Sequence, residues 1–165
     1  MRILGIDPGT AIMGHGLIEQ KGNQLKPLKY GSWRTSPRTP MPERLLSLYR
    51  ELEFFIKENK PDVLAVEELF FNRNTSTAIS VGQARGIVLL AGAQAGLAVY
   101  EYTPLQVKQA VVGYGKADKQ QVQHMVKALL GLQEIPKPDD TADALAIAIC
   151  HAHSAHLLKR MEGTL

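Results

Sequence analysis

Cysteine is nearly absent from this chain, because Cys150 is the only one in 165 residues. A single cysteine excludes an intrachain disulfide and a multi-cysteine zinc site, and it is typical of a reducing compartment. Long apolar runs are also missing. The longest run, Ala144 to Cys150, is far shorter than the roughly 20 residues that span a bilayer. Asp7, close to the first residue, argues against a signal peptide. We therefore expect a cytoplasmic protein without a membrane segment.

The chain also has few aromatic residues and little net charge. Aromatic residues make up 6% of the sequence, charged residues 21%, apolar residues 45%, and the formal net charge is +3. This composition is typical of a globular domain, and the weak positive charge does not by itself indicate a nucleic-acid partner. The length fits one domain. We expect a single domain over residues 1–156, followed by a C-terminal tail at 157–165.

Apolar runs and turn residues predict a mixed α/β fold. Short apolar runs at the start of the chain indicate three antiparallel strands. Helical spacing from Glu43 and a continuous apolar run at Val63–Val66 then indicate a helix and a buried strand. The predicted elements are strands at 3–6, 14–19, 25–35, 63–66 and 98–102, and helices at 43–60, 75–96, 104–112, 118–130 and 140 to about 156. We expect a sheet of about five strands with helices on both faces, and right-handed crossovers place strand 63–66 beside strand 3–6.

Acidic residues follow two of these strands. Asp7 and Glu67 each come directly after an apolar run, and Asp140 and Asp143 share one face of the last helix. Taken singly, Asp7 could be a turn residue and Asp140 a helix cap. Together they would repel one another unless a cation neutralised them. Oxygen donors without histidine or cysteine suit Mg²⁺, with Mn²⁺ as a substitute, in a site of one or two ions for phosphodiester hydrolysis.

Two neighbouring acids compete for these roles. Strand alternation directs Glu68 away from Glu67, so Glu67 is preferred. Asp139 lies four residues before Asp143, and spacing alone does not decide between Asp139 and Asp140.

Five stretches of the sequence resemble the RuvC family of bacterial Holliday-junction resolvases. They are Leu4–Thr10 (LGIDPGT), Val66–Phe71 (VEELFF), Val81–Gly86 (VGQARG), Gln106–Val126 and Asp139–His151 (DDTADALAIAICH). The resemblance implies a ribonuclease H-like fold, Mg²⁺ dependence and a homodimer that cuts four-way DNA junctions symmetrically in recombination and repair. It also implies action beside the RuvA and RuvB branch-migration proteins.

Residue by residue, the resemblance maps the family's four acidic positions onto Asp7, Glu67, Asp140 and Asp143, and its acid-x-x-Asp motif favours Asp140 over Asp139. Some members have histidine where this chain has Asp140.

Basic and aromatic residues near these motifs are candidate DNA contacts. Lys108, Lys116 and Lys119 flank a glycine-containing loop, and the family has lysines at the positions of Lys108 and Lys119. We expect contacts with phosphate there. Phe70 matches a family aromatic that stacks on junction bases, and Arg73 lies on the same predicted loop.

Other features admit a structural interpretation. The basic residues between 21 and 50 are interpreted as a solvated surface. The histidines His124, His151, His153 and His156 are interpreted as structural or surface residues. The small residues of the 75–96 helix make it the candidate dimer interface, although they could equally pack within one chain. Two alternatives stay open: another ribonuclease H-like nuclease, for instance one acting on RNA–DNA hybrids, and a non-catalytic junction-binding protein.

Overall fold

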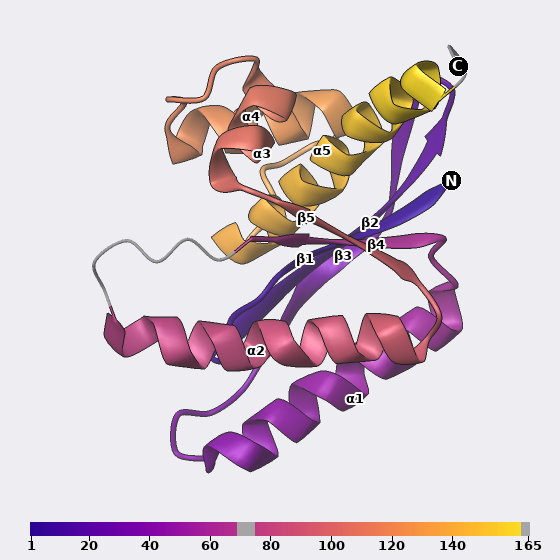
Figure 1. The fold of residues 1–165 in the computed structure, drawn as a ribbon. Coiled ribbons are helices and arrows are strands. Elements are labelled where there is room, and N and C mark those ends of the chain that lie inside the picture. Colours follow the sequence, from indigo (N-terminus) through magenta and orange to yellow (C-terminus); the bar gives the residue numbers. More distant parts are fainter. Residues whose placement is uncertain (69–74, 163–165) are drawn as a thin grey trace.

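The computed structural model describes residues 1–68 and 75–162, and the side chains of 1–68 and 78–155. Ten elements follow one another along the described chain (Figure 1). They are β1 (Arg2–Asp7), β2 (Ile12–Lys21), β3 (Gln24–Arg34), α1 (Met41–Asn59), β4 (Val63–Glu67), α2 (Thr75–Gln94), β5 (Ala98–Tyr102), α3 (Pro104–Val112), α4 (Lys119–Leu130) and α5 (Asp139–Glu162).

The strands form one mixed sheet in the order β3-β2-β1-β4-β5. β1 pairs antiparallel with β2 and parallel with β4. The prediction that the first and fourth strands lie side by side is therefore confirmed. Ile6 pairs with Val66 in this register, which brings the next residues, Asp7 and Glu67, to the same edge of the sheet. The carboxyl edge of β1 and β4 therefore carries both acids.

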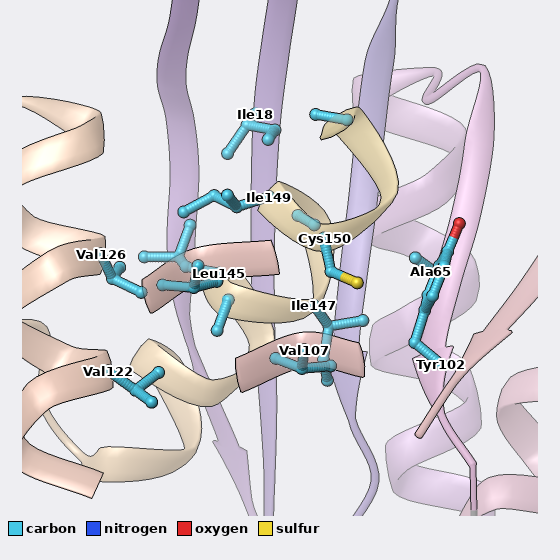
Figure 2. Packing of buried hydrophobic residues seen from close by; sticks show 14 of the residues in the cluster. Ile18, Ala65, Tyr102, Val107, Val122, Val126, Leu145, Ile147, Ile149 and Cys150 are labelled. Carbon is cyan, nitrogen blue, oxygen red and sulfur yellow. The ribbon is translucent and has the colours of Figure 1, made fainter. Parts of the chain in front are cut away.

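Helices cover the two faces of the sheet in separate layers. α1 and α2 lie on one face, and α3, α4 and α5 lie on the other (Figure 1). Strand alternation feeds both layers, because Ile3 packs with α5 whereas Leu4 packs with α1 and α2. Figure 2 shows the cluster on the α5 face, in which Leu145 and Ile149 of α5 lie near Val126 of α4.

Because side chains alternate along a strand, Ile3, Gly5 and Asp7 of β1 all lie on the α5 face.

Glycines in β1 and β2 let the backbone of α5 lie directly on the sheet. A Cβ atom at Gly14 would be 1.9 Å from the Asp140 carbonyl oxygen, and one at Gly5 would be 2.1 Å from the Ala144 carbonyl oxygen. No side chain fits at either position. Because Gly14 is also the register partner of Asp7, this contact places the first turn of α5 beside the end of β1.

Element boundaries differ from the prediction at several helix ends and at β2, which extends two residues beyond the predicted strand 14–19 at each end. α1 begins at Met41 and α2 ends at Gln94, each about two residues earlier than expected. α5 begins at Asp139 and continues to Glu162, so its backbone extends beyond the predicted end near 156. The sequence from 157 to 162 contains neither glycine nor proline, and Gly163 follows it, which explains why nothing ends the helix sooner. In the described part of the chain, no helix combines the length and apolar character needed to cross a membrane.

The contact at Gly14 is testable. Gly14→Ala should destabilise the protein by about 1–3 kcal/mol, because the added methyl group must push the first turn of α5 away from β2. That shift also moves Asp140 and Asp143 relative to Asp7, so any activity that depends on these acids should fall more than the folded fraction does. Thermal denaturation and an activity assay on the same sample measure both effects. Wild-type stability in this variant would contradict the proposed role of the close contact.

Candidate active site

Four half-buried carboxylates come from three elements that meet at one edge of the sheet. Asp7 ends β1, Glu67 ends β4, and Asp140 and Asp143 lie in the first turns of α5. Asp7 and Glu67 belong to the strand positions that face α5, since Gly5 and Ala65 two residues earlier do so. The structure therefore brings together the acids that the sequence predicted.

The acids lie close enough to perturb one another's protonation. Burial raises the pKa of Asp7 to about 8, assisted by the negative charges of Asp143, Glu67 and Asp140 and opposed by Lys119. Burial likewise raises the pKa of Glu67, with a further contribution from Asp143. The pKa of Asp143 is raised by burial against the opposing effect of Lys119. Groups with such perturbed pKa values in a cleft are candidates for a functional site.

Two of the predicted lysines lie beside the acids. Lys119 Nζ is 3.1 Å from a carboxylate oxygen of Asp143 and 3.3 Å from one of Asp139. Burial acts to lower the pKa of Lys119, but its hydrogen bonds and ion pairs with Asp143 and Asp139 outweigh burial and raise it. The positive charge of Lys108 lowers the pKa of Glu67. The lysines thus offset part of the negative charge of the cluster.

A cavity of about 230 Å³ joins these groups. Its lining includes Glu67 and Asp143 together with Lys108 and Lys119, while Val107, Val122 and Ile147 supply apolar surface. This concave, partly apolar space with convergent charged groups is the form expected of a substrate site.

Capping boxes fix the starts of the two helices that carry Lys108 and Lys119. Asp118 caps α4, accepting a hydrogen bond from Gln121 N at 2.8 Å, and the Gln121 side chain accepts one from Asp118 N at 2.9 Å. Lys119 is therefore the first residue of a firmly started helix. Thr103 and Gln106 form the equivalent capping box at the start of α3, the helix that carries Lys108.

One further predicted DNA contact, Lys116, lies outside the cavity. Lys116 is exposed in the loop between α3 and α4 and does not line the cavity. Phe70 and Arg73 fall outside the described residues. Glu68 is exposed, and its N–H donates to the Tyr102 carbonyl oxygen at 2.8 Å. The Asp139 side chain is 61% exposed, whereas Asp140 contributes to the raised pKa of Asp7.

The donor set suits a hard divalent cation. Carboxylate oxygens are the ligands that Mg²⁺ and Mn²⁺ take in proteins. Burial raises the pKa of Asp7 most, and a cation would relieve the repulsion among the acids that raises it further. Among the described residues, no three carboxylate, imidazole or thiolate groups already converge at ligand distance. The fit therefore rests on the chemistry and mutual repulsion of the acids rather than on a preformed coordination sphere.

One link at the site edge was not predicted from the sequence. Arg44 Nε donates to Thr35 Oγ1 at 2.7 Å, and the Thr35 hydroxyl donates to the Thr10 carbonyl oxygen. This chain ties the start of α1 and the end of β3 to the loop that follows Asp7. No sequence pattern indicates it, because the three residues are far apart in the chain.

Two histidines, His15 and His151, are buried. His151 Nδ1 and the Tyr102 hydroxyl share a buried hydrogen bond of 2.7 Å. His15, which sequence analysis passed over, is buried and stacks on Trp33 with ring centroids 4.2 Å apart. In the described structure, neither ring contacts a residue of the acid cluster.

The sheet order, the helix layers and the carboxylates at the edge of β1 and β4 define a ribonuclease H-like fold with a nuclease-type site. Comparison with known proteins narrows this class. The family model "Crossover junction endodeoxyribonuclease RuvC" matches residues 3–151, and the chain belongs to the RuvC family.

Relatives and solved structures agree with this assignment. The chain is 78% identical over its full length, and over the full length of the relative, to a crossover junction endodeoxyribonuclease RuvC of Desulfitobacterium hafniense. It is 64% identical to that of Heliobacterium modesticaldum, covering 93% of this chain and 95% of the relative. The structure of Thermus thermophilus RuvC in complex with Holliday junction substrate matches with a TM-score of 0.91 at 42% identity, covering 95% and 96% of the two chains. The yeast mitochondrial Holliday junction resolvase Ydc2 shares the fold, with a TM-score of 0.69 at 14% identity over 99% of this chain and 84% of that one.

The raised pKa of Asp7 predicts a stability cost. The unfolded carboxyl group ionises near 3.8, whereas the folded one keeps its proton until about pH 8. Between these values the unfolded state binds fewer protons, so stability falls as pH rises through this window. Asp7→Asn removes the cost. In metal-free buffer at pH 8 we expect this variant to be more stable than wild type by about 1 kcal/mol or more, a Tm increase of roughly 2–4 °C.

Asp139→Asn is the matched control for this measurement. Its carboxylate is exposed and pairs with Lys119, so its loss should change stability by less than about 1 kcal/mol. Equal pH dependence of the wild type and Asp7→Asn would show that Asp7 is not under electrostatic stress.

Proposed function

We propose that this chain is a crossover junction endodeoxyribonuclease, which resolves four-way DNA junctions by paired, symmetric phosphodiester hydrolysis in recombination and repair. One observation carries the proposal within the family: four carboxylates from three elements meet beside two lysines that line the same cavity. A protein that only binds DNA gains nothing from acids that repel phosphate, which disfavours the non-catalytic alternative. The nuclease domain spans residues 1–156 in this proposal, with 157–165 as a tail.

Each site residue has a role in the proposed reaction. Asp7, Glu67, Asp140 and Asp143 hold Mg²⁺, or Mn²⁺ in its place, as one or two ions per site. When bound, such an ion would polarise a phosphoryl oxygen of the DNA and lower the pKa of a bound water. Lys108 and Lys119 bind the phosphate that enters the cavity; Lys119 exchanges its contact with Asp143 for this phosphate.

Three further residues are proposed to contact DNA outside the cavity: Lys116 through phosphate, Phe70 by stacking on an unpaired base, and Arg73 through phosphate.

A homodimer fits the substrate, because two matched cuts in a symmetric junction need two sites related by a twofold axis. The outward face of α2 is the proposed interface. Ile79 is 72% exposed and Leu90 is 57% exposed, and Gly86 lies between them with open space where a Cβ would be. Small and apolar residues on one helix face permit close packing of two copies. RuvA and RuvB are proposed as working partners from family membership.

Site assignment can be tested with neighbouring acids. Asp140→Asn should lower the rate of junction cleavage at least about a hundredfold, because a lost metal ligand forfeits several kcal/mol of transition-state stabilisation. Asp139→Asn, one residue away and mostly exposed, should be much milder. Cleavage of a labelled four-way junction and of a linear duplex of the same sequence distinguishes a junction-selective enzyme from a general nuclease. The reverse ranking of the two variants would contradict the assignment.

Dimer formation is separately measurable. Sedimentation at micromolar concentration should give about twice the 18.1 kDa chain mass. Leu90→Lys should shift the protein towards monomer, because it places two like charges against each other across a twofold interface. If the Leu90→Lys variant sediments with the same mass as the wild-type dimer, the interface does not lie on α2. A wild-type monomer that still makes paired cuts would contradict the dimer itself.

A further inference from the structure

The fold sorts the basic residues of the 21–50 stretch between two ends of one strand. β3 runs antiparallel to β2, as β1 does, so β3 ends at the same edge of the sheet as β1. Its last residue, Arg34, pairs with Ile12, while Lys26 near its start pairs with Glu19 at the opposite edge. The stretch is therefore not one uniform surface. Arg34 lies at the edge with the acids, and Lys26 lies at the far edge.

Arg34 also lies on the face of the sheet that the acids occupy. Its partner Ile12 is two residues before Gly14, and Gly14 faces α5. Side chains two apart on a strand share a face, and paired residues do so as well. Two strand spacings and two residues along β3 separate Arg34 from Asp7, which is about 12 Å between their Cα atoms.

Arg34, Arg38 and Arg44 carry positive charge that acids do not neutralise. Arg34 and Arg38 are exposed, and Arg44 lies in the first turn of α1. Within the described parts of the chain none of the three forms an ion pair, whereas Lys21, at the opposite edge, pairs with Glu19 at 3.1 Å.

Arg44 is fixed relative to the acid cluster. Its Nε donates to Thr35 Oγ1 at 2.7 Å, and the Thr35 hydroxyl donates to the Thr10 carbonyl oxygen in the loop after Asp7. The backbone N–H of Thr35 also donates to the Ala11 carbonyl oxygen, at 3.0 Å. A phosphate bound by Arg44 would therefore be held at a set distance from Asp7.

We propose that Arg34, Arg38 and Arg44 bind the phosphate backbone of the substrate DNA away from the cleaved bond, on the opposite side of the acids from Lys108 and Lys119. A DNA arm rises 3.4 Å along its helix axis per nucleotide of one strand, so an arm that lies along the separation of about 12 Å spans three or four nucleotides there. The contacts are independent of base sequence and fix the register of the strand in the site. This inference rests on the proposed function and identifies where its substrate extends.

The first experiment compares two double variants with equal charge loss. Arg34→Gln/Arg38→Gln removes two of the three proposed contacts, and Lys26→Gln/Lys29→Gln is the control farther back on the same strand. Junction binding is measured as a function of salt concentration in the presence of Ca²⁺. Circular dichroism first checks that both double variants are folded. The arginine variant should lose about two units of slope in log affinity against log salt. The lysine control should keep the wild-type slope. Equal slopes in both variants overturn the proposal.

The second experiment locates the contact on the DNA. Junction strands carry one neutral methylphosphonate in place of a phosphate, scanned over six positions on either side of the cleaved bond. Wild-type affinity should fall most at a position three or four nucleotides away, and the arginine variant, which keeps only Arg44 of the three contacts, should show a clearly smaller loss there. A loss of the same size in both proteins at every position overturns the proposal. If the wild type cuts no junction in Mg²⁺, the proposed function itself fails, which is a result distinct from either outcome above.

Discussion

The structure depends on how closely the backbone of α5 approaches the sheet. Gly14 and Gly5 present no side chain, so carbonyl oxygens of α5 lie where Cβ atoms would otherwise be. This contact sets Asp140 and Asp143 against the ends of two parallel strands. It also creates the electrostatic stress of the site, because buried carboxylates are held side by side and the pKa of Asp7 rises to about 8. Holding these carboxylates together lowers the stability of the fold, and a bound divalent cation would relieve the repulsion among them.

Positive groups surround the stressed acids on two sides. Lys119 contacts Asp143 and Asp139, and Lys108 acts on Glu67 across the cavity. On the other side, Arg44 is tied through Thr35 to the loop after Asp7. A DNA strand can therefore meet positive charge before and after the acids, although the chain as a whole carries a formal net charge of only +3. Local placement, rather than total charge, suits this surface to a polyanion.

The sequence predicted the parts of this arrangement that follow from local patterns. Apolar runs that end in an acid located Asp7 and Glu67, and the right-handed crossover rule placed their strands side by side, as the sheet order confirms. The resemblance to the family selected the acid-x-x-Asp register of α5. The contribution of Asp140, but not of Asp139, to the raised pKa of Asp7 supports that choice.

Long-range features could not be predicted in the same way. The role of Gly14 appears only when Asp140 is packed against it, since glycine in a strand has several meanings. The basic stretch looked like one solvated surface because its division depends on the direction of β3 in the sheet. The extension of α5 to Glu162 likewise follows from the absence of a breaker rather than from a positive signal.

The central claim is that the acid cluster is stressed until a divalent cation binds, and the effect of Mg²⁺ on thermal stability tests it most directly. Wild type and Asp7→Asn are melted at pH 8 with and without saturating Mg²⁺, and again at pH 5.5. The account predicts that Mg²⁺ raises the wild-type Tm at pH 8, that the rise shrinks at pH 5.5 where Asp7 holds a proton, and that Asp7→Asn barely responds. Equal responses of both proteins at both pH values would contradict it.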